Sequence, residues 1–233
     1  MRLGSSFLQT AAILSAVVFT AGFYTRVSLW SDVPVTTFFS ADCLFAGRLF
    51  RQDKLRGALL FLTIWSFMVL FAGTVLKSLE YTLVVDLTSS KAFSLAMDLA
   101  GVTLFFTVLF YFLRRLVDKK VRSITLMGDI GVLAALTLIL ITGFMLEGAR
   151  MAYQPDADGI WSPIGLLVSK VMRFSGQKDA LMFQAVLYNI HALLVFASIA
   201  CVPFSKQFHM FSAQAVTYWS KKYAEKRKRL MHE

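Results

Sequence analysis

Long apolar runs separated by short polar stretches dominate this chain. Five of them have the length of a membrane-spanning helix, at residues 6–30, 58–79, 92–113, 129–146 and 181–204. A hydrocarbon layer of about 30 Å needs about 20 helical residues, because every backbone amide in lipid must be paired within its own helix. The pattern therefore predicts an all-α integral membrane protein, a bundle of five transmembrane helices.

The first apolar run has the basic start of a signal peptide, because Arg2 precedes it. It lacks a small-x-small cleavage site, however, and it continues past Phe23. We therefore interpret it as a retained membrane helix. The connection at residues 147–180 holds Pro155, Trp161 and Pro163 and a modest apolar stretch, which predicts a short helix at the membrane surface near residues 165–171.

Composition supports a lipid environment. The 233 residues are 57% hydrophobic and 16% charged, whereas a soluble domain carries about 25% charged residues. The net charge of +10 does not indicate nucleic-acid binding, because the basic residues lie beside the apolar runs.

The basic residues also predict an orientation, since cytoplasmic loops are enriched in Lys and Arg. Seventeen of the 24 fall on one side of the predicted bundle. They are Arg26, Arg48, Arg51, Lys54, Arg56, Arg114, Arg115, Lys119, Lys120, Arg122, Lys206, Lys221, Lys222, Lys226, Arg227, Lys228 and Arg229. We expect an external N-terminus and a cytoplasmic C-terminus, with a membrane domain at residues 1–213 and a basic cytoplasmic tail at residues 214–233. The tail has two interpretations, an anchor to anionic lipid and a dock for a cytoplasmic subunit.

Other chemistry is not indicated. Cys43 and Cys201 lack metal or redox spacing and are predicted to be ordinary buried or interfacial thiols. The chain has no glycine-rich phosphate loop, nucleophile elbow or zinc spacing.

Two of the three histidines stand out. His191 lies about halfway along the fifth apolar run, where an ionisable side chain needs a partner. His209 follows 18 residues later, but Pro203 intervenes and predicts a break in the helix. Imidazole is a common axial ligand of haem iron; the alternative for His191 is a hydrogen-bonded core histidine. His232 is predicted to be solvated.

Residues 191–213 read HALLVFASIACVPFSKQFHMFSA. This string resembles the last membrane helix of the family that contains the gamma subunit of respiratory nitrate reductase, and its relatives in heterodisulfide reductase and sulfite-reduction-associated complexes are the most similar. In that family a ligand histidine precedes a PFSK-x-x-H motif that ends in a second ligand. The resemblance implies that His191 and His209 are ligands of b-type haem. The string ITGFMLEGAR at residues 141–150 resembles the heterodisulfide branch.

One departure from the family lies in the second helix, which normally supplies partner histidines before and after a WGF-like triplet. Here the triplet is Trp65-Ser66-Phe67, and the two positions hold Leu60 and Leu70. Leucine cannot bind iron, so haem is either five-coordinate, held by an unusual ligand such as Met68 or Met97, or absent.

A quinone site needs an apolar slot with one or two polar groups that handle protons. Four residues at the outer ends of the second and fourth helices are candidates for it, namely Lys77, Glu80, Glu147 and Arg150. Their alternative role is interfacial anchoring and ion pairing. Asp98, the acid within the third run, is either a proton relay or a partner for a nearby polar group.

Chiefly by resemblance, we predict a membrane subunit of a respiratory redox complex in a prokaryotic cytoplasmic membrane. It would transfer electrons between the menaquinone pool and a cytoplasmic iron-sulfur subunit, with further membrane or periplasmic cytochrome subunits as possible partners. The alternative is a cofactor-free anchor or assembly subunit. A small transporter is disfavoured, because no broken-helix pair or inverted repeat is evident.

The predicted orientation can be tested with a single engineered thiol. Because residue 226 belongs to the basic tail, Lys226→Cys should be unreactive toward an impermeant thiol reagent in intact cells. It should become labelled when the membrane is permeabilised. Labelling in intact cells would contradict a cytoplasmic C-terminus.

Overall fold

The computed structural model describes residues 5–28, 33, 47–83, 90–153, 160–172, 174–205 and 208–230. In these ranges the chain is helical and contains no strand. Its elements are α1 (Ser5–Val27), α3 (Gly47–Gln52), α4 (Lys54–Leu83), α5 (Lys91–Val117), α6 (Lys119–Ser123), α7 (Met127–Tyr153), α8 (Pro163–Val171), α9 (Gln177–Cys201), a 3₁₀ turn (Val202–Phe204) and α10 (His209–Leu230).

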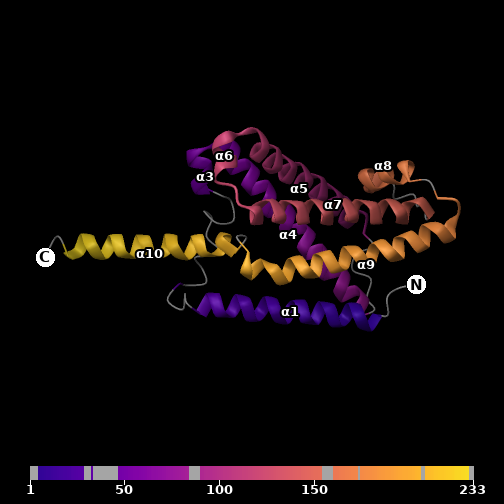
Figure 1. Cartoon of the computed structure of the whole chain (residues 1–233), viewed down its shortest axis with the longest axis horizontal. Helices are drawn as coiled ribbons and strands as arrows, with labels where there is room; N and C mark the ends of the chain where they lie inside the picture. The colour runs from indigo at the N-terminus through magenta and orange to yellow at the C-terminus, as the bar shows by residue number, and fades with distance from the viewer. Residues whose placement is uncertain are drawn as a thin grey trace. The chain divides into compact units, whose positions relative to one another are not determined.

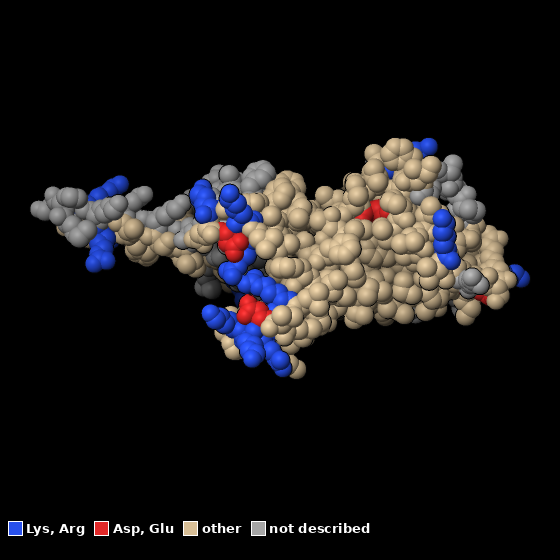
Figure 2. Space-filling view, turned by 90° about the horizontal axis from the view of Figure 1, so that it is seen from above, with Lys and Arg blue, Asp and Glu red and all other residues tan. Residues whose placement is uncertain are grey.

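Five of these helices, α1, α4, α5, α7 and α9, are long and apolar enough to cross a membrane. Most of the surface visible in Figure 2 is formed by residues other than Lys, Arg, Asp and Glu, as expected of faces that contact lipid. The prediction of an all-α protein with five spans is therefore confirmed. The orientation of the termini stays a prediction, as does the division at residues 213 and 214.

Contacts divide the chain into two units, and the first comprises Met1–Ala11 and Leu62–Val195. Its core lies between α5 and α7, where Leu104 and Val108 pack against Leu133 and Leu140. α8 packs on α7 and also contacts α5, and Figure 1 shows it alongside α7. α7 and α9 are joined near their ends, where the Tyr153 hydroxyl donates to Gln184 Oε1 at 2.7 Å.

The second unit comprises Ala12–Phe61 and Phe196–Glu233. Within it, the Ser15 hydroxyl on α1 donates to the carbonyl of Phe196 at 2.7 Å. The ring of Phe208 meets Phe23 edge-on, with centroids 5.8 Å apart, and the guanidinium of Arg26 lies 5.2 Å from its centroid. These contacts fasten α1 to the segment around Pro203.

The helix boundaries differ from the apolar runs in two informative ways. α7 continues to Tyr153, seven residues beyond the predicted end, so Glu147 and Arg150 lie on the helix itself. α9 ends at Cys201, and the helical path is interrupted at Pro203, as predicted, because proline has no N–H to donate.

Two smaller predictions can also be compared with the structure. The predicted short helix is present as α8, which begins at Pro163, a favoured first residue of a helix, and its place at the membrane surface stays a prediction. Cys201 is a free, exposed thiol. The predictions for Arg2, Cys43, Pro155, Lys206 and His232 concern positions outside the described residues.

The contact between α7 and α8 depends on Gly148, which has no side chain. A Cβ added at Gly148 of α7 would lie 2.8 Å from Val168 Cβ and 3.2 Å from the Ser169 backbone nitrogen of α8. Real Cβ atoms do not approach other atoms so closely, and Val168 is β-branched and therefore stiff. Gly148 thus allows the two helices to approach each other closely, as small residues do at membrane helix interfaces.

We expect Gly148→Ala to lower stability by about 1–3 kcal/mol, because the methyl group overpacks the α7–α8 contact. Thermal unfolding in detergent micelles measures the effect. Gly131→Ala is the matched control, since it lies on the same helix and has no atom within 4 Å of the added Cβ. Equal melting temperatures for the two variants would refute this explanation of the contact.

Candidate functional site

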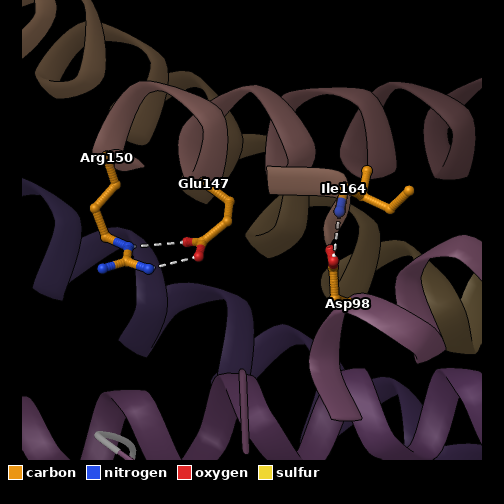
Figure 3. Close-up of polar contacts among 4 residues, drawn as sticks. All are labelled: Asp98, Glu147, Arg150 and Ile164. Carbon is orange, nitrogen blue, oxygen red and sulfur yellow. Dashed lines mark hydrogen bonds and ion pairs between the residues drawn. The ribbon is translucent and has the colours of Figure 1, made fainter. Parts of the chain in front are cut away.

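Asp98 is buried within the span of α5, about 10 Å along the helix axis from its first residue at 1.5 Å per residue. Its carboxylate accepts a hydrogen bond from the backbone N–H of Ile164, at 2.8 Å, as Figure 3 shows. The Ser162 hydroxyl and the Gly165 N–H are further hydrogen-bond partners. Asp98 therefore binds the N-terminus of α8.

This contact replaces the usual cap of a helix. Ser162 occupies the N-cap position of α8, but its side chain makes no capping hydrogen bond. Pro163 follows and has no N–H, so the amides of Ile164 and Gly165 are the first that need acceptors. A carboxylate on another helix supplies the acceptor, and its negative charge also suits the positive end of the α8 dipole.

A second acidic residue lies beside the same helix terminus. Glu147 forms a two-point ion pair with Arg150, at 2.7 and 3.1 Å, along one face of α7 (Figure 3). A Cβ added at Gly165 would lie 2.7 Å from Glu147 Cγ and 2.9 Å from Ser162 Oγ. Glu147 is also close enough to Asp98 to interact with it electrostatically.

We call Asp98, Glu147, Arg150 and Ser162 the α8 polar cluster. It joins three helices, and it combines two carboxylates with one guanidinium and the N-terminal amides of α8. The exposed side of α8 carries Leu167, 59% exposed, and Val171, 76% exposed, together with the exposed Lys170. The cluster thus places two carboxylates and a guanidinium next to a helix that also exposes apolar side chains.

His191 is partly buried on α9 and rests against α7. Its Nδ1 lies 2.8 Å from the hydroxyl oxygen of Thr142. A Cβ added at Gly143 would meet the ring at Cε1, 3.4 Å away. The carbonyl of Ile139 is another hydrogen-bond partner of the imidazole. α7 therefore holds the Nδ1 side of the ring.

The residues present can be compared with the needs of a haem. One imidazole held through Nδ1 suits an axial ligand, because metal-binding histidines usually use one ring nitrogen for iron and the other for a hydrogen bond. The second ligand is not supplied by the expected positions of α4. Leu70 packs against the hydrophobic core, and Leu60 carries no donor atom.

The two methionines raised as unusual ligands have other surroundings. Met97 packs its sulfur against Gly73 of α4, and Met68 is 52% exposed. Among the described residues no group of three or more His, Cys, Asp and Glu side chains could hold a metal ion. His191 is thus a described residue whose contacts with α7 would suit a haem ligand, and the expected positions of α4 supply no second one.

The remaining predicted site residues are less closely defined. Lys77 and Glu80 lie three residues apart on α4; Lys77 is exposed and Glu80 is partly exposed. They stay candidates by position alone. His209 is the first residue of α10. The Glu147–Arg150 pair shows the ion pairing that we considered for these residues.

Sequence reasoning missed two contributors, Thr142 and the amide of Ile164. Thr142 lies inside the ITGFMLEGAR string, but its distance of 49 residues from His191 gives no sign of a contact. The donor of Ile164 is its backbone N–H, so the type of residue at this position gives no sign of the contact.

Comparison with known families gives one match. The family model described as "Nitrate reductase gamma subunit" matches residues 55–229, about three quarters of the chain. The matched range includes α5, α7, α8 and α9, and therefore both the α8 polar cluster and His191. No curated protein matches the sequence.

Removing the Asp98 carboxylate should loosen α8. A hydrogen bond to a charged group contributes about 1.5–3 kcal/mol, so Asp98→Ala should raise local opening of α8 about tenfold or more. Trypsin cleavage after the exposed Lys170 in reconstituted vesicles reports that opening. Asp129→Ala is the control, because Asp129 accepts from the Leu126 N–H at the start of α7. If both variants were cleaved at the same rate, the capping role of Asp98 would be wrong.

Proposed function

Since the chain belongs to the nitrate reductase gamma subunit family, whose members are membrane cytochrome b-type subunits of respiratory redox complexes, we propose that it transfers electrons between quinone and a soluble partner. The quinone is menaquinone, and the partner is a cytoplasmic iron-sulfur subunit. The membrane is the prokaryotic cytoplasmic membrane.

The observation that supports this proposal most directly is the α8 polar cluster. Oxidation of a quinol releases two electrons and two protons, and reduction of a quinone takes up the same number. A site for this chemistry needs groups that exchange protons next to the bound ring. Asp98 and Glu147 are carboxylates at one helix terminus, and Arg150 is a cation within reach of Glu147.

We assign roles to these residues accordingly. Arg150 binds a quinone oxygen and orients the headgroup, while Glu147 and Asp98 exchange its protons. The exposed apolar residues of α8, Leu167 and Val171, contact the isoprenoid tail or the surrounding lipid. Lys77 and Glu80 lie near the C-terminal end of α4 and complete the candidate set.

His191 is the residue that we expect to hold b-type haem, with His209 as the second candidate ligand. When bound there, haem would carry single electrons through the apolar layer. The protein's contribution is the orientation of the imidazole, which Thr142 and Ile139 of α7 hold through hydrogen bonds.

A group of basic residues at the end of α5 and on α6 is suited to bind the partner subunit. The end of α5 and the short helix α6 carry Arg114, Arg115, Lys119, Lys120 and Arg122 within nine residues. In the proposed orientation these residues face the cytoplasm, where they would bind an acidic surface of the partner. The basic tail is a second surface of the same character.

One alternative has its own support. Leu60 and Leu70 stand where the family supplies partner histidines, and Leu70 is used in core packing. A cofactor-free anchor that holds redox partners at the membrane would account for both leucines.

A spectrum of the purified complex separates the two functions. We expect a haem b signal after reduction by dithionite and by a menaquinol analogue, and His191→Leu should remove one haem's absorbance. Assembly should be little changed, because leucine suits the apolar span and α7 keeps its other contacts. The measurement is the reduced-minus-oxidised spectrum per mole of complex.

His232→Leu is the matched control, since this third histidine is predicted to be solvated. Its spectrum should equal that of the wild type. Unchanged haem in His191→Leu would rule out His191 as a ligand, and a haem-free wild type would favour the anchor.

A further inference from the structure

Thr142 has one hydroxyl proton and three acceptors or bases around it. Its Oγ1 lies 2.8 Å from the carbonyl oxygen of Leu138 and 3.0 Å from that of Ile139, both on its own helix. It also lies 2.8 Å from Nδ1 of His191. A carbonyl oxygen can only accept, so an oxygen at 2.8 Å with no proton between would be repelled. The hydroxyl proton therefore points to the backbone of α7.

The direction of the bond to His191 follows from this proton count. Because the hydroxyl has no second proton, its oxygen can meet Nδ1 only as an acceptor, and Nδ1 must carry the hydrogen. The Thr142 hydroxyl is the contact that defines this arrangement, which makes the tautomer a consequence of the hydrogen bonds of Thr142.

We propose that Thr142 is a positioning residue that fixes His191 in the Nδ1–H form and leaves the lone pair of Nε2 for a ligand. Gly143, the next residue of α7, lies against the same ring, since an added Cβ would make an ordinary van der Waals contact with Cε1 at 3.4 Å. Thr142 therefore sets both the tautomer and the orientation of the imidazole without touching the ligand itself.

For iron this inference rests on the proposed function. A hydrogen bond accepted from the distal ring nitrogen increases the basicity of the ligating nitrogen and restrains ring rotation. Loss of such a partner typically weakens metal binding by about 10-fold to 100-fold. A threonine in the middle of a membrane helix thus has a role beyond its bond to the helix backbone.

The tautomer can be measured without haem. We suggest nitrogen-15 histidine labelling of the full chain in lipid bilayers, produced without a haem supply, with the His191 signals identified by their loss in His191→Leu. The wild type should show a protonated Nδ1 and an unprotonated Nε2, and Thr142→Val should shift and broaden the Nδ1 signal. Protonation at Nε2 instead, or an Nδ1 signal unchanged by Thr142→Val, would overturn the proposal.

Two further variants separate a positioning role from plain helix packing. Thr142→Ser keeps the acceptor and should keep the wild-type signal. Thr137→Val removes a hydroxyl that bonds the Leu133 carbonyl at 2.7 Å on the same helix, and it should leave His191 unaffected. A shift in Thr137→Val as large as that in Thr142→Val would also overturn the proposal.

Haem affinity distinguishes failure of this inference from failure of the proposed function. In the loaded complex, Thr142→Val should bind haem about 10-fold more weakly than the wild type, and Thr142→Ser should restore binding. If His191→Leu lost haem but Thr142→Val bound it normally, the role of Thr142 would be refuted and the proposed function would stand. A haem-free wild type would refute the haem assignment, and the nitrogen signals would still decide the tautomer.

Discussion

The first amides of α8 impose a requirement that the rest of the first unit satisfies. The first N–H groups of a helix need hydrogen-bond acceptors, and an apolar bundle and lipid chains offer none. Each unsatisfied group costs several kcal/mol. Asp98 accepts from Ile164 at 2.8 Å and meets this need. An isolated carboxylate in the same place would itself be costly. The helix terminus and the acid therefore compensate each other, and this mutual need fixes where α8 packs.

α7 connects this arrangement with the histidine. It carries Glu147, Gly148 and Arg150 on the side of α8, and Thr142 beside His191. Thr142 precedes Glu147 by five residues, so the two are separated by about 7.5 Å along the helix axis at 1.5 Å per residue. One helix thus carries two of the quinone-site candidates, Glu147 and Arg150, and the threonine that contacts His191, at a fixed spacing.

The spans and α8 could be predicted from the sequence, because crossing lipid demands about 20 apolar residues and because Pro163 marks a helix start. The end of α7 could not be predicted, because the charged Glu147 and Arg150 end the apolar run although the helix continues to Tyr153. The chemistry of Glu147 and Arg150 was visible as residue types, and their spacing of three residues is that of a helical ion pair. Contacts between helices were not accessible. The bond between Thr142 and His191 depends on how α7 and α9 are rotated about their axes, and the partner of Asp98 is a backbone group.

The break at Pro203 changes how the histidine motif should be understood. α9 ends at Cys201 and α10 starts at His209, so the separation of 18 positions between the two histidines is not made of 18 steps along one helix. The angular relation that a continuous helix would impose on them does not apply. The direction of the His191 side chain is determined by the register of α9. One residue inserted between the two helices would therefore not cause the rotation of about 100° that an insertion within a continuous helix causes, and it would leave His191 at its place on α9. The motif therefore places its two histidines on two separate helices rather than at a fixed spacing along one helix.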